Sequence, residues 1–195
     1  MPAPIEDGYR VPDWIRVLVS DAPRSIPVAQ RSSSPDTTAA AEARAQRELR
    51  RIIHAAIRRF SETLSWEFSV PGRYRKGGAT FEDVFGYLAE QGKDFTADSR
   101  RLHDRVRTAL MAEYEDADAV PLALEFRETA ADAILETIVA RLENRLRDVG
   151  IASNRDSYTR AKMKAGYDSR VGIRTGQLLA AVKARGAVKV KATTR

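Results

Sequence analysis

Residues 39–68 read AAAEARAQRELRRIIHAAIRRFSETLSWEF, and this stretch decides the fold class of the chain. Its larger apolar side chains recur at steps of three and four residues, which places them on one face of a helix. These side chains are Leu49, Ile52, Ile53, Ala56, Ile57, Phe60 and Leu64. Asp36, Thr37 or Thr38 can cap the start of the helix, and Pro71 is expected to end it. The pattern predicts one long amphipathic helix.

A second stretch of the same kind covers residues 121–149. Its apolar stripe consists of Phe126, Ala130, Ile134, Ile138, Leu142 and Leu146. Pro121 suits the first turn of this helix, and Gly150 suits its end. The two long helices have matching stripes and are expected to pack along each other, although such stripes also suit oligomerisation.

Two shorter helices are expected between the long ones, over about residues 81–91 and 96–115. Thr80, with Asp83 three residues later, predicts a capping box at the start of the first. The sequence therefore predicts a mainly α fold, in which a helical bundle with two long helices occupies residues 36–150.

The N-terminal residues 1–35 contain six of the eight prolines, so no helix is expected to run through them. Between these prolines, residues 14–19 read WIRVLV, a run that favours a strand and is too apolar to remain in water. We interpret residues 1–35 as an extended arm that docks through Trp14 and Leu18. A disordered leader is the alternative. The first residues carry Pro, Glu and Asp where a signal peptide needs a basic start, so none is expected.

The positive charge is concentrated at the C-terminal end. Residues 151–195 hold eleven Lys or Arg and two Asp, so their net charge is 11 − 2 = +9. The net charge of the whole chain is +6, so residues 1–150 carry 6 − 9 = −3. This basic segment predicts contact with nucleic acid or an acidic protein surface, with a solvated basic tail as the alternative. Arg73, Arg75 and Lys76 are further candidates for phosphate contact, although a solvated turn explains them as well.

The residues that carry most chemistry are sparse. The chain has no cysteine, which excludes disulfides and thiolate sites. Its two histidines, His54 and His103, lack the spacing of metal ligands, and no nucleophile or phosphate-loop motif occurs. No apolar run approaches the roughly 20 residues that span a membrane. We therefore expect a non-enzymatic protein with no cofactor, no metal, no membrane span and no small-molecule substrate.

The basic segment also has an ordered arrangement of glycines and apolar residues. A helix is expected over residues 155–164, and Thr175 is expected to cap a second short helix whose apolar side includes Leu179 and Val182. Alternation over residues 187–191 predicts a strand with Val188 and Val190 on one face.

This segment resembles part of the tailed-bacteriophage virion-morphogenesis and tail-completion (neck) proteins. The resemblance covers roughly the last 40 residues and rests on an ordered set: Tyr158, Lys162, Lys164, Gly166, Tyr167, Arg174, Thr175, Gly176, Leu179 and Val182. It implies a structural subunit of a homo-oligomeric ring at the head–tail junction, without catalysis or cofactor. The expected location is the virion, assembled in the cytoplasm of the bacterial host.

The expected partners are other neck, portal or tail proteins, together with DNA in the channel. The docking residues are predicted to be Trp14, Leu18, Tyr158, Lys162, Lys164, Tyr167, Arg174, Thr175, Gly176, Leu179, Val182, Val188 and Val190. The family has several strands after its Thr-Gly helix, whereas this chain offers one. That strand is expected to pair with the arm at residues 14–19 or with a neighbouring subunit. The alternative function is nucleic-acid binding by the basic C-terminal segment.

Overall fold

The computed structural model describes the chain except for residues 1–34, 76–77, 168, 170–175 and 192–195, and except for the side chains of residues 35–38. The described part is mainly α, as expected. Its elements are α2 (Pro35–Glu62), β1 (Ser65–Ser69), α3 (Phe81–Glu90), α4 (Arg100–Tyr114), α5 (Ala123–Leu142), α6 (Asp156–Lys164), α7 (Gln177–Arg185) and β2 (Ala187–Lys191). The arm expected over residues 1–35 lies outside the described residues except for Pro35.

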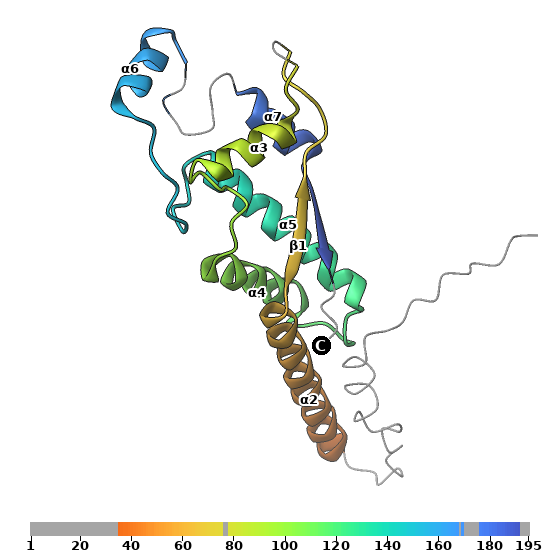
Figure 1. Ribbon diagram of the computed structural model, residues 1–195. Coiled ribbons are helices and arrows are strands. Elements are labelled where there is room, and N and C mark those ends of the chain that lie inside the picture. Colours follow the sequence, from red (N-terminus) through yellow and green to blue (C-terminus); the bar gives the residue numbers. More distant parts are fainter. Residues whose placement is uncertain (1–34, 76–77, 168, 170–175, 192–195) are drawn as a thin grey trace, which may run out of the picture.

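Helix α5 lies at the centre of the fold (Figure 1). Helix α4 packs against both α5 and α2, while β2 and α7 pack against α5 from another side. The two long helices were expected to pack along each other, but helix α4 packs against both of them instead. Helices α2 and α5 come together where the rings of Phe60 and Phe126 lie 5.7 Å apart. Most of the predicted stripes are buried here, namely Ile53, Ala56, Ile57, Phe60 and Leu64 with Phe126, Ala130, Ile134, Ile138 and Leu142. The periodicity therefore identified the core correctly.

The N-terminal half of α2 projects away from this core (Figure 1). From Ala39 to Arg51 every side chain is exposed except that of Leu49, which is partly buried. Only the second half of the helix carries the stripe that packs against α4 and the rest of the core.

The prediction that a helix continues to residue 68 was wrong, because α2 ends at Glu62 and β1 follows. Trp66 and Phe68 alternate with Ser65, Glu67 and Ser69 in this strand. Side chains two residues apart lie on the same face of a strand, and aromatic residues favour strands. This period of two replaces the helical period immediately after Leu64.

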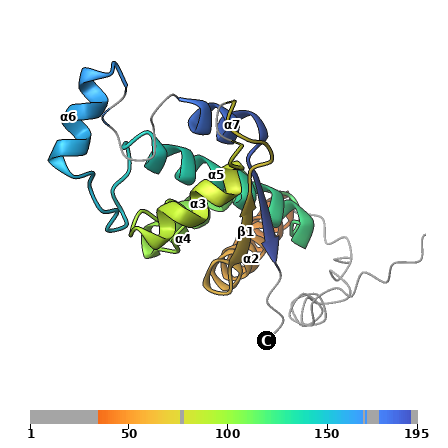
Figure 2. The ribbon, with the colours of Figure 1, turned by 45° about the horizontal axis from the view of Figure 1, so that its top comes forward.

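The predicted C-terminal strand is confirmed as β2, and its partner in the described part of the chain is β1, a strand that was not predicted. Strands β1 and β2 pair antiparallel, with Trp66 opposite Val190 and Phe68 opposite Val188. Both views place this two-stranded sheet beside α5 (Figures 1 and 2). The chain thus supplies the partner of its own last strand from the segment that directly follows α2.

Helix α5 ends at Leu142, earlier than the predicted residue 149. The chain turns at Asn144, whose φ of 59° lies in the left-handed region that Asn tolerates better than most residues. The N–H groups of Arg145 and Leu146 both donate to the carbonyl oxygen of Ala140, at 2.8 and 3.2 Å. The turn, and not Gly150, therefore ends the helix.

Candidate docking interface

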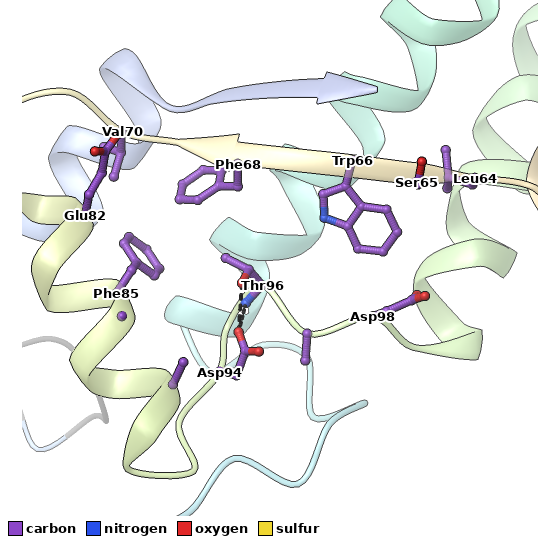
Figure 3. Close-up of a pocket in the computed structure, with 13 residues that line it drawn as sticks. Leu64, Ser65, Trp66, Phe68, Val70, Glu82, Phe85, Asp94, Thr96 and Asp98 are labelled. Carbon is purple, nitrogen blue, oxygen red and sulfur yellow. Dashed lines mark hydrogen bonds between the residues drawn. The ribbon is translucent and has the colours of Figure 1, made fainter. Parts of the chain in front are cut away.

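A groove opens between β1, α3 and the loop that precedes α4 (Figure 3). Trp66 and Phe68 project into it from β1, and Phe85 projects from α3. The rings of Phe68 and Phe85 meet edge to face, with centroids 5.1 Å apart. All three aromatic side chains remain only partly buried, and the groove has a volume of about 500 Å³. It offers an aromatic floor that is open to solvent.

Three carboxylates border this floor, and no Lys or Arg is among the described residues that line the groove. Glu82 comes from α3, while Asp94 and Asp98 come from the loop before α4. Asp94 accepts two hydrogen bonds of 2.8 Å from Thr96, one from its backbone N–H and one from its hydroxyl. We call this region the acidic groove. Its chemistry suits a partner that combines apolar and cationic side chains.

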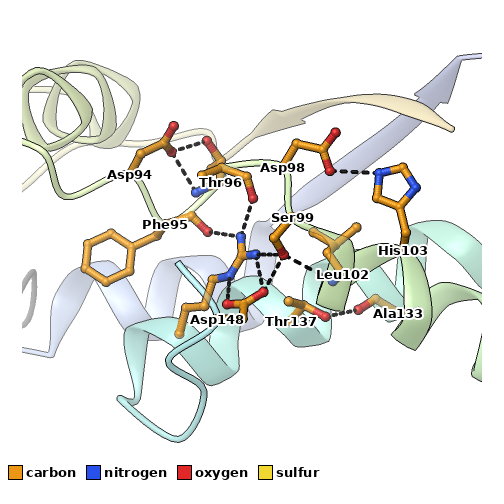
Figure 4. A network of polar contacts seen from close by, with 12 residues as sticks. Asp94, Phe95, Thr96, Asp98, Ser99, Leu102, His103, Ala133, Thr137 and Asp148 are labelled. Carbon is orange, nitrogen blue, oxygen red and sulfur yellow. Dashed lines mark hydrogen bonds and ion pairs between the residues drawn. The ribbon is translucent and has the colours of Figure 1, made fainter. Parts of the chain in front are cut away.

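A buried arginine holds the loop that forms one wall of the acidic groove (Figure 4). The Arg141 side chain on α5 is fully buried and donates to the carbonyl oxygens of Phe95 and Ala97, at 3.0 and 2.7 Å. It also pairs with Asp148 through Nε–Oδ1 at 2.8 Å and Nη2–Oδ2 at 2.7 Å. Ser99, which caps α4 by accepting from the Leu102 N–H, receives a further bond of 2.9 Å from Arg141.

The pKa of Asp148 reflects this pairing. Burial of the carboxylate would raise the pKa, but hydrogen bonds from Arg141 and then Ser99 outweigh burial and hold the pKa at about 2. Asp148 therefore remains charged and keeps the Arg141 guanidinium compensated inside the protein. This network is structural, and sequence reasoning missed both residues. The only signal was a single arginine within the apolar run TIVARL at residues 137–142.

The predicted docking residues of α7 and β2 divide into two groups. Val182 and Val190 are 0% and 8% exposed and belong to the core of this chain. Leu179 and Val188 are partly buried against that core. Gly176 occupies the N-cap of α7 with a φ of 74°, a left-handed conformation that favours glycine. The cap was predicted at Thr175 instead, which lies outside the described residues, as do Arg174, Trp14 and Leu18.

The predicted docking residues of α6 and of the turn that follows it are more accessible, with one exception. Tyr158 is 50% exposed and Tyr167 is 37% exposed, and Lys164 is also exposed, whereas Lys162 is only 5% exposed. The Lys162 ammonium lies 5.8 Å from the centre of the Tyr158 ring, within reach of a cation–π contact.

Tyr158 and Lys162 line a second cavity of about 520 Å³ between α3 and α6. Its lining includes the cations Lys93, Arg155 and Lys162 and the aromatic residues Tyr87 and Tyr158, and no carboxylate is among the lining residues that the structure describes. Lys93 donates a hydrogen bond of 3.1 Å to the side-chain oxygen of Asn154. We call this region the basic pocket. Sequence reasoning named Tyr158 and Lys162 as docking residues and counted Arg155 only within the basic segment. It missed Lys93 and Tyr87, because they are remote from α6 in the chain.

The other candidates for phosphate contact lie on a separate turn. Arg73 and Arg75 are exposed, and the Arg75 N–H donates to the Gln177 side chain at 3.4 Å. Lys76 lies outside the described residues. The turn joins β1 to α3, whose start has the predicted capping box of Thr80 and Asp83.

The histidines do not form a metal site. The His103 ring nitrogens lie 2.7 Å from the Ser61 carbonyl oxygen and 2.8 Å from Asp98 Oδ1, so His103 connects α4 to the end of α2 and to the groove rim. His54 is exposed on α2. In the part of the chain that the structure describes, no three His, Cys, Asp or Glu side chains are arranged to hold a metal ion. None of the described helices combines the length and apolar character that a bilayer crossing requires.

Comparison with known proteins adds no relative: the chain matches no protein-family model, and no curated protein or solved structure matches it significantly.

Proposed function

We propose that this chain is a non-enzymatic structural subunit of a tailed-phage virion, acting at the head–tail junction as part of a homo-oligomeric ring. In this role α2 and α5 form the bundle that carries the interface, and the Pro-rich arm at residues 1–35 reaches a neighbouring subunit. Its other contacts are neck, portal or tail proteins. The proposal is supported by the order of residues over Tyr158–Val182, which resembles the neck and tail-completion proteins.

The observation that carries the proposal is the projecting half of α2. An exposed helical stretch as short as residues 39–51 is marginal in water without packing, because most helical stability comes from tertiary contacts. The exposed stretch from Ala39 to Arg51 has few such contacts within the described residues. A neighbouring subunit would supply them.

Coexpression with the proteins encoded by neighbouring genes tests this function. We expect the chain to copurify in a fixed ratio with portal, neck or tail proteins. Amide hydrogen exchange should then slow in residues 39–51 relative to the isolated chain, because packing protects helical N–H groups. A chain that stays alone and monomeric under coexpression would contradict the proposal.

Nucleic-acid binding is a second candidate, and the basic pocket favours it. Lys93, Arg155 and Lys162 supply positive charge there, while Tyr87 and Tyr158 supply rings on which bases stack. Retention on DNA should fall steeply as salt rises from about 50 to 200 mM, because phosphate contacts release counterions. Retention that does not change over this range would exclude this candidate.

A further inference from the structure

The apolar run at residues 14–19 needs a surface against which to be buried. Its expected partner strand is β2, but β1 occupies that position. We propose that residues 14–19 of one copy add as a strand along the outer edge of β1 in a second copy, over the acidic groove. This inference rests on the proposed ring assembly and specifies the contact that builds it.

The outer edge of β1 pairs with no further strand in the described part of the chain. Among the described residues the sheet contains only β1 and β2. Strand β2 lies on one side of β1, and the acidic groove lies on the other (Figure 3). The outer edge of a strand presents N–H and C=O groups that can pair with another extended segment. Strand β2 packs against α5, so β1 is the edge that borders an open cavity.

The acidic groove and the run WIRVLV match in side-chain chemistry. In an extended segment Trp14, Arg16 and Leu18 share one face, because side chains alternate. On that face the guanidinium of Arg16 lies between two apolar side chains, one of Trp14 and one of Leu18. The groove has an aromatic floor with Glu82, Asp94 and Asp98 at its border. Trp14 and Leu18 would cover the aromatic rings, and Arg16 would meet the carboxylates.

The length of α2 favours the arm of a second copy over the chain's own arm. The 28 residues of α2 span about 42 Å, and the groove lies beyond their C-terminal end. Residues 20–34, which join the run to α2, extend to about 50 Å at most. The chain's own arm would have to lie almost straight along α2, which costs conformational entropy. An arm from a neighbour has no such restriction, and its repetition from subunit to subunit closes a ring.

Site-specific cross-linking tests the contact directly, because the chain contains no cysteine. One full-length preparation carries Arg16→Cys, and a second carries Glu82→Cys or Asp98→Cys at the exposed border of the groove. We expect a disulfide-linked pair of chains when the two preparations are mixed under mild oxidation. The matched control is Arg155→Cys in the basic pocket, on the other side of α3, which should not cross-link to residue 16.

A pair of arm variants adds a readout that is independent of cysteine chemistry. Leu18→Asp places a charge on the face that we assign to the aromatic floor, and it should weaken self-association by about ten- to a hundredfold. Val17→Asp places the same charge on the opposite face and should weaken it less. Equal effects of the two variants would overturn the assigned orientation of the segment.

The outcomes separate this inference from the proposed function. Absence of a cross-link at both border positions would overturn the inference. A double variant with Arg16→Cys and Glu82→Cys that forms a disulfide only within one chain would overturn it as well. A ring that persists after removal of residues 1–20 would overturn the inference and the proposed arm contact, while leaving the proposed role as a ring subunit intact. A cross-link between copies in a chain that fails to join any particle protein would support the inference and contradict the proposed function.

Discussion

The two sides of α3 differ in charge although they share one short helix. Glu82 and Phe85 face the acidic groove, whose described lining carries three carboxylates and no Lys or Arg. Tyr87 and Leu88 face the basic pocket, where the lining residues in the described part of the chain include three cations and no carboxylate. Side chains three and four residues apart share a helix face, so α3 separates two surfaces that recruit different chemistry. The acidic side suits a cationic apolar segment, and the basic side suits an acidic or nucleic-acid partner.

The largest expected effect on stability comes from Arg141→Met. This change removes the hydrogen bonds that hold the loop at the wall of the acidic groove. The change leaves Asp148 buried without its partner, and losing one member of a buried pair costs about 3–5 kcal/mol. The melting temperature should fall by roughly 6–20 °C. Arg145→Ala is the control, because Arg145 is exposed and its pair with Glu143 lies at the surface, where pairs contribute about 1 kcal/mol or less. Similar losses in both variants would contradict the assigned role of the network.

Low pH should destabilise the same loop at the wall of the acidic groove in the unmutated chain. The folded-state pKa of Asp148 is about 2, below its ordinary value of 3.8, so its charged form is favoured in the folded protein. This contribution, on the order of 2 kcal/mol, is fully present above about pH 4 and is lost as the pH falls toward 2. Urea unfolding at several pH values measures it. The stability difference between the natural chain and Asp148→Asn should shrink over this window, and a constant difference would contradict the assignment.

A smaller effect is expected from Val190→Ala, which loosens β2 behind the groove. Val190 lies opposite Trp66 and is 8% exposed, so losing two methyl groups should cost about 1.5 kcal/mol. Val188→Ala, at a less buried position of the same strand, should cost less. Urea unfolding compares the two variants. If Val188→Ala is the more damaging change, the burial order that we assign to the sheet is wrong.

The smallest effect is expected on the basic side. Lys93→Ala combined with Arg155→Ala should leave thermal stability nearly unchanged and weaken retention on single-stranded DNA. If both residues contact phosphates, the slope of log affinity against log salt should decrease by about 1.4. Glu82→Gln, on the opposite side of α3, should leave that slope unchanged. An unchanged slope in the double variant would show that the basic pocket does not bind nucleic acid.

Local periodicity predicted much of the fold. It identified the buried stripes of α2 and α5, and the short-range signal at Thr80 and Asp83 predicted a capping box that the structure confirms. It also predicted β2. These features depend on neighbours within a few residues, which a sequence displays directly.

The errors arose where distant residues decide the structure. Residues 65–69 directly follow the apolar stripe of residues 49–64, but pairing with residues 187–191 makes them a strand. Helix α5 ends early because the chain turns at Asn144 and brings Asp148 back to Arg141. Both pockets likewise join segments that are remote in sequence, so the opposite charges on the two sides of α3 became visible only in the folded chain.

The native mass of the purified chain, compared with that of a chain lacking residues 1–20, tests the central claim most directly. We predict that the full-length chain forms a defined multiple of its subunit mass and that the shortened chain is a folded monomer. A full-length chain that remains monomeric at concentrations of about 100 μM, well above the dissociation constant of a specific interface, would contradict the account.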